Sequence, residues 1–295
     1  MDNSRIEKAI MEYKNEFSTE KEVKNALENI KAKSEKNYNK EVLYKLLGSI
    51  DITSLHTTDT EKEIAEFTEK VNKMADNYGD KAKVAAICVY PSLVKTVKET
   101  LKKDDVHIAA VSGGFPHSQT FMEVKVAETL LCITDGADEI DIVISLGKFL
   151  NGDVEEVAEE ISEIKDCCKD KHLKVILESG AIKKYDDLYK ASILALEAGA
   201  DFIKTSTGKQ QPAATPEAAI VMCKAIKDFY EKRGEMRGFK AAGGISTAKD
   251  AVLYYTIVEQ ILGNQWLNSE YFRIGASSLA NDILTAIEGK EVKYF

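Results

Sequence analysis

Short apolar runs rich in β-branched residues alternate with longer amphipathic stretches after residue 48. Eight such runs are bounded by polar residues or glycine, which predicts eight strands. They are Ser49–Thr53, Val84–Tyr90, His107–Val111, Glu139–Ile144, Leu173–Glu178, Asp201–Ser206, Gly238–Ala242 and Tyr271–Ala276. Because parallel strands need crossover connections, this alternation predicts an α/β fold, a parallel (β/α)8 TIM barrel. A doubly wound open sheet is the alternative architecture.

The helix boundaries are marked by local signals. Segments 60–63 and 247–250 resemble capping boxes, in which a threonine side chain and an acidic side chain satisfy backbone N–H groups of the first turn. Thr215 precedes a proline that suits the first helical position. Gly199 and Gly263 are candidate helix ends. These signals fall between the predicted strands, as the barrel requires.

Residues 1–45 lie outside the alternation and are predicted to form an N-terminal helical extension, with residues 46–295 as the barrel domain. We expect two helices, a polar connector at residues 31–40, and a short third helix before Gly48. A capping box at Thr19 and Glu22 would begin the second helix. The residues expected to face a core are Ile6, Ile10, Tyr13 and Phe17 in the first segment, Val23, Leu27 and Ile30 in the second, and Val42, Leu43, Leu46 and Leu47 in the third. The extension is interpreted as an arm that contacts another subunit or partner, or as a helical layer across the closed bottom of its own barrel.

Composition narrows the class of function. The formal net charge is -9, and the lysine-rich segments are interleaved with Glu or Asp, so we expect no nucleic-acid or anionic-membrane partner. No apolar run approaches the roughly 20 residues of a membrane helix, and Met1–Asn3 open an acidic segment unlike a signal peptide, which predicts a cytoplasmic protein. The five cysteines lack metal-ligand spacing and are expected to be reduced thiols.

The segment Asp201–Lys209 places a lysine, Lys204, inside an apolar run that leads into a hydroxyl-rich, glycine-containing loop. An ammonium group is costly to bury unless it is paired or its pKa is lowered, in which case a usable neutral amine results. The alternative is a lysine that extends from a strand end to water.

Further reactive groups occur on other strands, and barrel active sites form where the strand ends converge. Lys240, on the neighbouring strand, would disfavour the charge on Lys204 and make it a nucleophilic amine. Asp141, expected at the end of the fourth strand, could pair with Lys240 or relay a proton through water. Taken singly, Asp141 and Lys240 could instead be surface ion-pair residues.

Three turns at the same expected end carry small residues with exposed backbone N–H groups, and two of them also carry hydroxyl groups. They are 204–208, Gly243-Gly244 and 275–278, and two of them lead directly toward a helix. Such turns bind phosphate through backbone N–H groups and the positive end of the helix dipole. Glycines at tight strand–helix turns can also occur without a ligand.

Together these residues resemble the 2-deoxyribose-5-phosphate aldolases, a family of metal-free class I Schiff-base enzymes. The resemblance covers most of residues 49–285. It rests on matches at 51–55, 86–91, 115–117, 136–141, 199–208, 214–217, 238–244 and 272–278. It implies the Schiff-base lysine at Lys204, a lysine that tunes it at Lys240 and a proton-relay aspartate at Asp141.

The resemblance also implies a set of residues that bind the substrate and its phosphate. These are Asp51, Thr53, Cys88, Thr207, Gly208, Lys209, Gly243, Gly244, Ser277 and Ser278. Ser246 departs from the family, in which arginine is common at this point. Some relatives place a C-terminal tyrosine over the active site, which makes Tyr294 a further catalytic candidate.

The activity implied is reversible cleavage of 2-deoxy-D-ribose 5-phosphate to D-glyceraldehyde 3-phosphate and acetaldehyde, in deoxyribose catabolism. Neither a metal nor another cofactor is expected, and a homodimer is compatible with the chain. Two alternatives stay open: another Schiff-base barrel aldolase of the transaldolase type, and a non-catalytic phosphate-binding barrel that interacts with a partner through residues 1–45.

Overall fold

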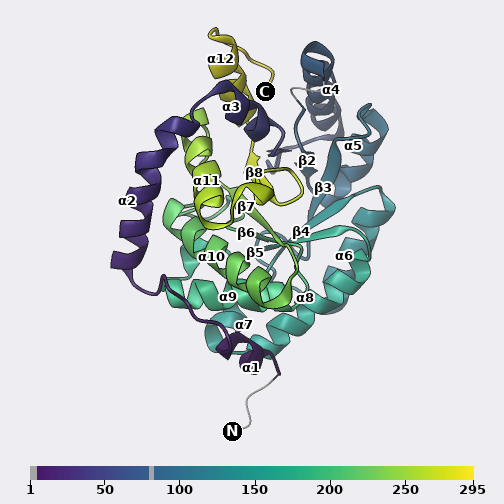
Figure 1. Ribbon diagram of the computed structural model, residues 1–295. Coiled ribbons are helices and arrows are strands. Elements are labelled where there is room, and N and C mark those ends of the chain that lie inside the picture. The colour runs from purple at the N-terminus through teal and green to yellow at the C-terminus, as the bar shows by residue number, and fades with distance from the viewer. Residues whose placement is uncertain (1–4, 80–82) are drawn as a thin grey trace.

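The computed structural model describes residues 5–79 and 83–295, and within them eight parallel strands close into a barrel in chain order (Figure 1). Pairing of the first strand with the last closes the barrel, so the TIM-barrel prediction is confirmed and the open sheet is excluded. Most strands are shorter than predicted. They are β1 (Ile50–Thr53), β2 (Ala86–Val89), β3 (His107–Ser112), β4 (Glu139–Val143), β5 (His172–Ile176), β6 (Phe202–Lys204), β7 (Gly238–Ala242) and β8 (Phe272–Ala276). Met1–Asn3 lie outside the described residues.

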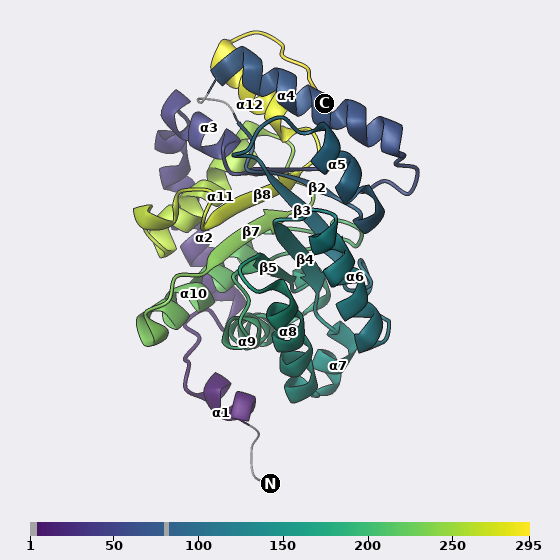
Figure 2. The same cartoon turned by 90° about the vertical axis from the view of Figure 1, so that its right-hand side faces the viewer.

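A ring of helices surrounds the barrel (Figures 1 and 2). The predicted threonine caps are confirmed: Thr60, Thr215 and Thr247 each accept a hydrogen bond from a backbone N–H of the first helical turn. The helices are α4 (Glu61–Tyr78), α5 (Val94–Thr100), α6 (Met122–Thr134), α7 (Leu146–Asn151), α8 (Val154–Cys168), α9 (Tyr185–Glu197), α10 (Pro216–Arg233), α11 (Ala248–Ile261) and α12 (Leu279–Glu288). In the part of the chain that the structure describes, no helix combines the length and hydropathy needed to cross a bilayer.

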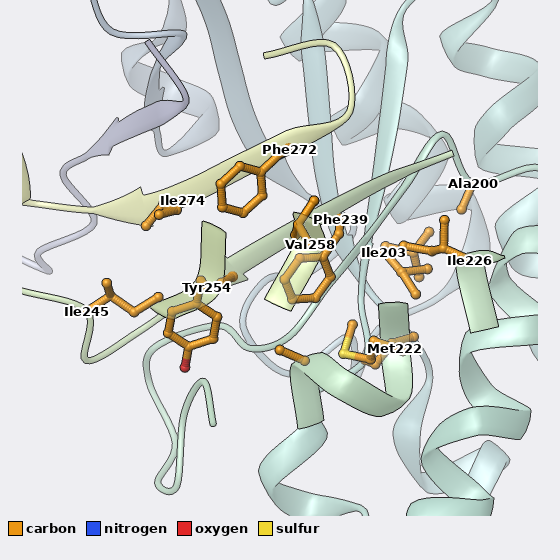
Figure 3. Packing of buried hydrophobic residues seen from close by; sticks show 14 of the residues in the cluster. Ala200, Ile203, Met222, Ile226, Phe239, Ile245, Tyr254, Val258, Phe272 and Ile274 are labelled. Carbon is orange, nitrogen blue, oxygen red and sulfur yellow. The ribbon is translucent and has the colours of Figure 1, made fainter. Parts of the chain in front are cut away.

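The main core lies between the strands and the helices. Ile203, Phe239 and Ile274 are fully buried on the outer face of β6, β7 and β8 (Figure 3). Met222 of α10 and Val258 of α11 belong to the same cluster. Because side chains alternate between the two faces of a strand, the residue next to each of these strand positions points into the barrel. Outward packing therefore fixes which side chains enter the lumen.

The N-terminal extension forms α1 (Arg5–Met11), α2 (Glu20–Asn37) and α3 (Lys40–Leu47). The capping box at Thr19 is present, and α2 buries the predicted apolar residues. Two expectations were wrong. Tyr13 and Phe17 follow the end of α1, and the predicted connector at 31–40 is mostly helical, since α2 continues to Asn37. Lysine, which favours helix, is the commonest residue type in that segment, and no glycine or proline interrupts it.

The extension lies on the outside of the helical ring, which does not match the alternative of a helical layer across the barrel bottom. Helix α2 packs against α10 and α11, and α1 against α8 and α9 (Figures 1 and 2). The side-chain amide of Asn37 donates to Glu259 Oε2 at 2.9 Å. At the other end, the backbone N–H of Ile6 donates to Glu155 Oε2 at 3.3 Å. Residues 45 and 46, the predicted domain boundary, both lie within α3.

Candidate active site

A cavity of about 330 Å³ opens at the carboxyl ends of β1, β6, β7 and β8. Its lining includes residues predicted for the site, which are Thr53, Lys204, Thr207, Gly208, Lys209, Gly243, Gly244, Ser277 and Ser278. Gly275 and Ala276 of the predicted turn 275–278 also line it, as do Leu55, His56, Ala242 and Ile245, which were not predicted. Ser246, the departure from the family pattern, is part of the same wall. The structure thus brings the three small-residue turns to one cavity.

Two of these turns approach so closely that glycine is required. Gly208 and Gly243 have φ values of +77° and +93°, which side-chain-bearing residues rarely adopt. A Cβ atom added to Gly243 would lie 2.6 Å from the Cβ of Ala213 and 3.1 Å from the Cα of Gly208. The third turn ends at Ser278, immediately before α12. Exposed backbone N–H groups and a helix N-terminus suit an anionic ligand.

Glu178, which was not predicted, holds the first of these turns. Its two carboxylate oxygens accept hydrogen bonds from the backbone N–H of Thr207 at 3.1 Å and from the Thr207 hydroxyl at 2.6 Å. The backbone N–H of Lys209 donates to Thr207 Oγ1 at 3.0 Å, and its ammonium group donates to the Leu55 carbonyl. An acidic residue at the end of an apolar strand was the signal that could have identified Glu178.

Lys204 forms part of the cavity wall, and its amine belongs to a connected cluster with three other predicted residues. Lys204 Nζ donates to Asp141 Oδ2 at 2.8 Å, and Lys240 Nζ donates to the same oxygen at 2.7 Å. Lys240 Nζ also lies 2.5 Å from Asp51 Oδ2. All four side chains are buried, with Lys204 3% exposed. Asp141 lies in the middle of β4 and not at its end, so the expected position along the strand was wrong.

The electrostatics distinguish the two lysines. Burial lowers the pKa of Lys204, and the Lys240 ammonium lowers it further, against the opposing effect of Asp141. Burial alone would also lower the pKa of Lys240, but Asp141 and Asp51 raise it above its ordinary value. Burial would raise the pKa of Asp141, yet Lys174, Lys204 and Lys240 hold it well below the usual range. Lys204 is therefore the base that loses its proton most readily.

Sequence reasoning missed three charged residues beneath these groups. Lys174 Nζ donates to Asp141 Oδ1 at 2.9 Å and to Glu139 Oε2. Arg273 donates to Asp51 Oδ1 at 2.7 Å and to Glu139 Oε1 at 2.8 Å. Lys174 and Arg273 each interrupt an apolar strand, which is the same signal that identified Lys204. Among the described residues no group of three or more His, Cys, Asp or Glu side chains is arranged to hold a metal ion.

The family profile of the DeoC/LacD family aldolases matches residues 45–282. The chain belongs to this family of aldolases. It is 40% identical over 289 residues to a putative deoxyribose-phosphate aldolase of Caenorhabditis elegans, covering 97% of this chain and 89% of the relative. It is 42% identical over 251 residues to the human deoxyribose-phosphate aldolase, covering 82% of this chain and 79% of the relative. A tetrameric deoxyribose-phosphate aldolase from Aeropyrum pernix has a TM-score of 0.67 at 26% identity, covering 87% of this chain and 96% of that structure.

Cys88 lies on the apolar side of this aldolase barrel. It packs with Leu55, Ala86, Ala109 and Val111 in a small cluster separate from the main core. Burial raises the pKa of its thiol, which keeps the group uncharged. The lumen therefore has an apolar part and a charged part. The apolar cluster comes from β2, β3 and the residues after β1, and the charged side chains described above lie on the other strands.

The structure does not bring Tyr294 to the aldolase site. Its hydroxyl accepts a hydrogen bond from the Asn77 side-chain amide at 2.6 Å, and its ring packs edge-on against Tyr78 at the end of α4. The side chain of Asn281 accepts from the backbone N–H of Tyr294 at 2.8 Å and donates to the Phe295 carbonyl at 2.6 Å. These contacts hold the tail against α4 and α12 and account for its position away from the cavity.

Proposed function

We propose that this aldolase reversibly cleaves 2-deoxy-D-ribose 5-phosphate into D-glyceraldehyde 3-phosphate and acetaldehyde through a Schiff base on Lys204. The observation that carries the proposal is the position of the Lys204 amine, in a cavity rimmed by three small-residue turns and in contact with a buried carboxylate. The names of the relatives from Caenorhabditis elegans and human support the choice of substrate. The reaction belongs to deoxyribonucleotide and deoxyribose catabolism.

The first half of the reaction forms the covalent intermediate. Neutral Lys204 attacks the aldehyde carbon C1 of the open-chain sugar, and loss of water gives an iminium ion. The amine is available because burial and Lys240 lower its pKa. The iminium carbon then accepts the electron pair of the C2–C3 bond as that bond breaks.

Proton transfer accompanies the cleavage. The C3 hydroxyl loses its proton to water held by Asp141, and the C3 carbon leaves as the aldehyde of glyceraldehyde 3-phosphate. The remaining enamine is protonated at its terminal carbon, and water hydrolyses the resulting imine to acetaldehyde and free Lys204. Lys174 and Lys240 keep the Asp141 carboxylate in place throughout, because each donates to one of its oxygens.

The rim binds the far end of the substrate. Gly208, Gly243, Gly244 and Ser278 line the cavity, and α12 begins directly after Ser278, so we expect their backbone N–H groups and the positive end of α12 to bind the phosphate. Lys209 adds positive charge to the same wall. Phosphate binding at the rim would hold the far end of the sugar while Lys204 reacts with C1 in the same cavity, so binding energy contributes to the rate.

Release of acetaldehyde from 2-deoxy-D-ribose 5-phosphate tests the proposal. The wild-type chain should release acetaldehyde in step with glyceraldehyde 3-phosphate, and Lys204→Ala should abolish release while retaining the fold. Lys62→Ala is the matched control, because the Lys62 side chain is 87% exposed. A preference for ketose phosphates would instead identify a transaldolase-like enzyme, and inactivity of folded wild-type protein on every aldol substrate would favour a binding protein.

We also infer that the protein is a cytoplasmic homo-oligomer, with residues 1–45 as a helical extension of the aldolase domain at 46–295. The tetrameric relative from Aeropyrum pernix supports assembly, and we favour a dimer for this chain. Light scattering coupled to gel filtration would test the assembly. A monomeric mass at the concentration used for activity would exclude it.

A further inference from the structure

The buried charges in the barrel are unequal in number. Among the described residues of the lumen, three carboxylates face four basic groups, namely Asp51, Glu139 and Asp141 against Lys174, Lys204, Lys240 and Arg273. Each of these residues is at most 3% exposed. With every group charged the cluster would carry one excess positive charge, and an unbalanced buried charge is strongly disfavoured.

The contacts indicate which base gives up its proton. Lys174, Lys240 and Arg273 each contact at least two carboxylates, at distances up to 3.8 Å. Among the described residues, Lys204 contacts one carboxylate oxygen, Asp141 Oδ2, and shares it with Lys240. The other oxygen of Asp141 accepts from Lys174. Loss of a proton from Lys204 thus balances the cluster without leaving a carboxylate unpaired.

We propose that Lys174 is a positioning residue that keeps the Lys204 amine uncharged by occupying Asp141 Oδ1 and completing the charge balance. The inference rests on the proposed function in one respect, the use of Lys204 as a nucleophile. Without Lys174, three carboxylates would face three bases, and a charged Lys204 would then be the balanced state. Burial and the Lys240 ammonium lower the pKa of Lys204, which is the direction that this charge count requires.

Other titratable groups border the cluster. His107 Nδ1 lies 2.8 Å and His172 Nδ1 3.8 Å from Glu139 Oε1, both at the partly exposed bottom of the barrel. Cys88 faces Lys204 and Lys240 as a neutral thiol, and Lys209 lines the cavity above. A protonated His107 would add positive charge and favour the neutral amine, so it acts in the same direction as Lys174.

Reductive methylation measures the Lys204 amine without any sugar substrate. Formaldehyde and cyanoborohydride would be applied over a series of pH values, and methylation of the Lys204 peptide quantified by mass spectrometry. Lys62, with its side chain 87% exposed, is the reference amine in the same molecule. Because the probe needs no deoxyribose phosphate, the test stands even if the proposed reaction fails.

Lys174→Met should move the methylation midpoint of Lys204 to higher pH and lower its rate at neutral pH by about 10-fold or more. Lys174→Arg, which retains the charge, should leave the midpoint in place. Adding Glu139→Gln to Lys174→Met removes one carboxylate and should restore the rate to within about threefold of wild type. A purely structural role for Lys174 would predict further damage in the double variant, not recovery.

Glu139→Gln alone should move the midpoint to lower pH, which keeps the proposal testable if Lys174→Met does not fold. Each variant is also measured in a His107→Gln background, where the nearer imidazole no longer contributes charge. An unmoved midpoint in folded Lys174→Met would overturn the proposal. Two other results would also overturn it. One is a Lys204 methylation midpoint in the Lys174→Met, Glu139→Gln variant that is displaced as far as in Lys174→Met alone. The other is an unmoved midpoint in the Glu139→Gln, His107→Gln variant.

Discussion

Replacing Lys240 with methionine tests how the neighbouring cation controls Lys204. Both ammonium nitrogens bond to Asp141 Oδ2, at 2.8 and 2.7 Å, so they lie at most about 5.5 Å apart. At an effective dielectric constant near 20, two unit charges at that separation repel by about 3 kcal/mol. Loss of this repulsion changes the ratio of amine to ammonium at Lys204 by roughly 100-fold. Methionine keeps most of the side-chain volume, so the packing changes little.

The pH dependence of kcat/KM for acetaldehyde release reports the change. The rate rises with pH as Lys204 loses its proton, and removal of a nearby positive charge stabilises the ammonium form. The rising limb of Lys240→Met should therefore lie at higher pH, with activity about 100-fold lower on its acid side. Lys240→Arg retains the charge and serves as the control. A rising limb that stays in place, or moves to lower pH, would refute the electrostatic role of Lys240.

Three further changes examine the rim, the tail and the extension. Gly243→Ala should lower kcat/KM for the phosphorylated sugar by about 10- to 100-fold. The reason is that the added Cβ would meet Ala213 and the backbone strain would be about 1–3 kcal/mol. An equal loss on unphosphorylated 2-deoxyribose would contradict a role in phosphate binding. Deleting residues 293–295 should leave exchange of the acetaldehyde methyl protons unchanged, and its loss would show that the tail reaches the site. Leu27→Ala should lower the free energy of unfolding in urea by about 2–4 kcal/mol and leave kcat unchanged. Glu28→Ala, at an exposed position of the same helix, is the control and should leave the free energy of unfolding unchanged.

The barrel architecture could be predicted from local sequence patterns, that is, from the order of apolar and polar residues along short segments of the chain. Strand β7 was predicted at its observed bounds, and the other strands within a few residues, because buried parallel strands form short apolar runs between polar boundaries. Where the extension packs could not be predicted. Apolar residues on α2 indicate that a face is buried, but they do not identify α10 and α11 as the elements that cover it.

Part of the candidate site was predictable for a similar reason. Lys204 and Lys240 were found as charges within apolar strands, and Lys174 and Arg273 carry the same signal but were not singled out. What sequence could not provide was their pairing. Contacts such as Lys174 with Asp141 depend on the stagger of the strands around the closed barrel, which no local pattern records.

Trapping the covalent intermediate tests the central claim, that Lys204 is the Schiff-base nucleophile. Purified protein is incubated with acetaldehyde and reduced with borohydride, and the modified peptide is mapped by mass spectrometry. We expect a reduced two-carbon adduct on Lys204, in an amount that matches the loss of activity, and none on that peptide in Lys204→Ala. Active, folded protein without an adduct at Lys204, or with its inactivating adduct on another lysine, would contradict the account.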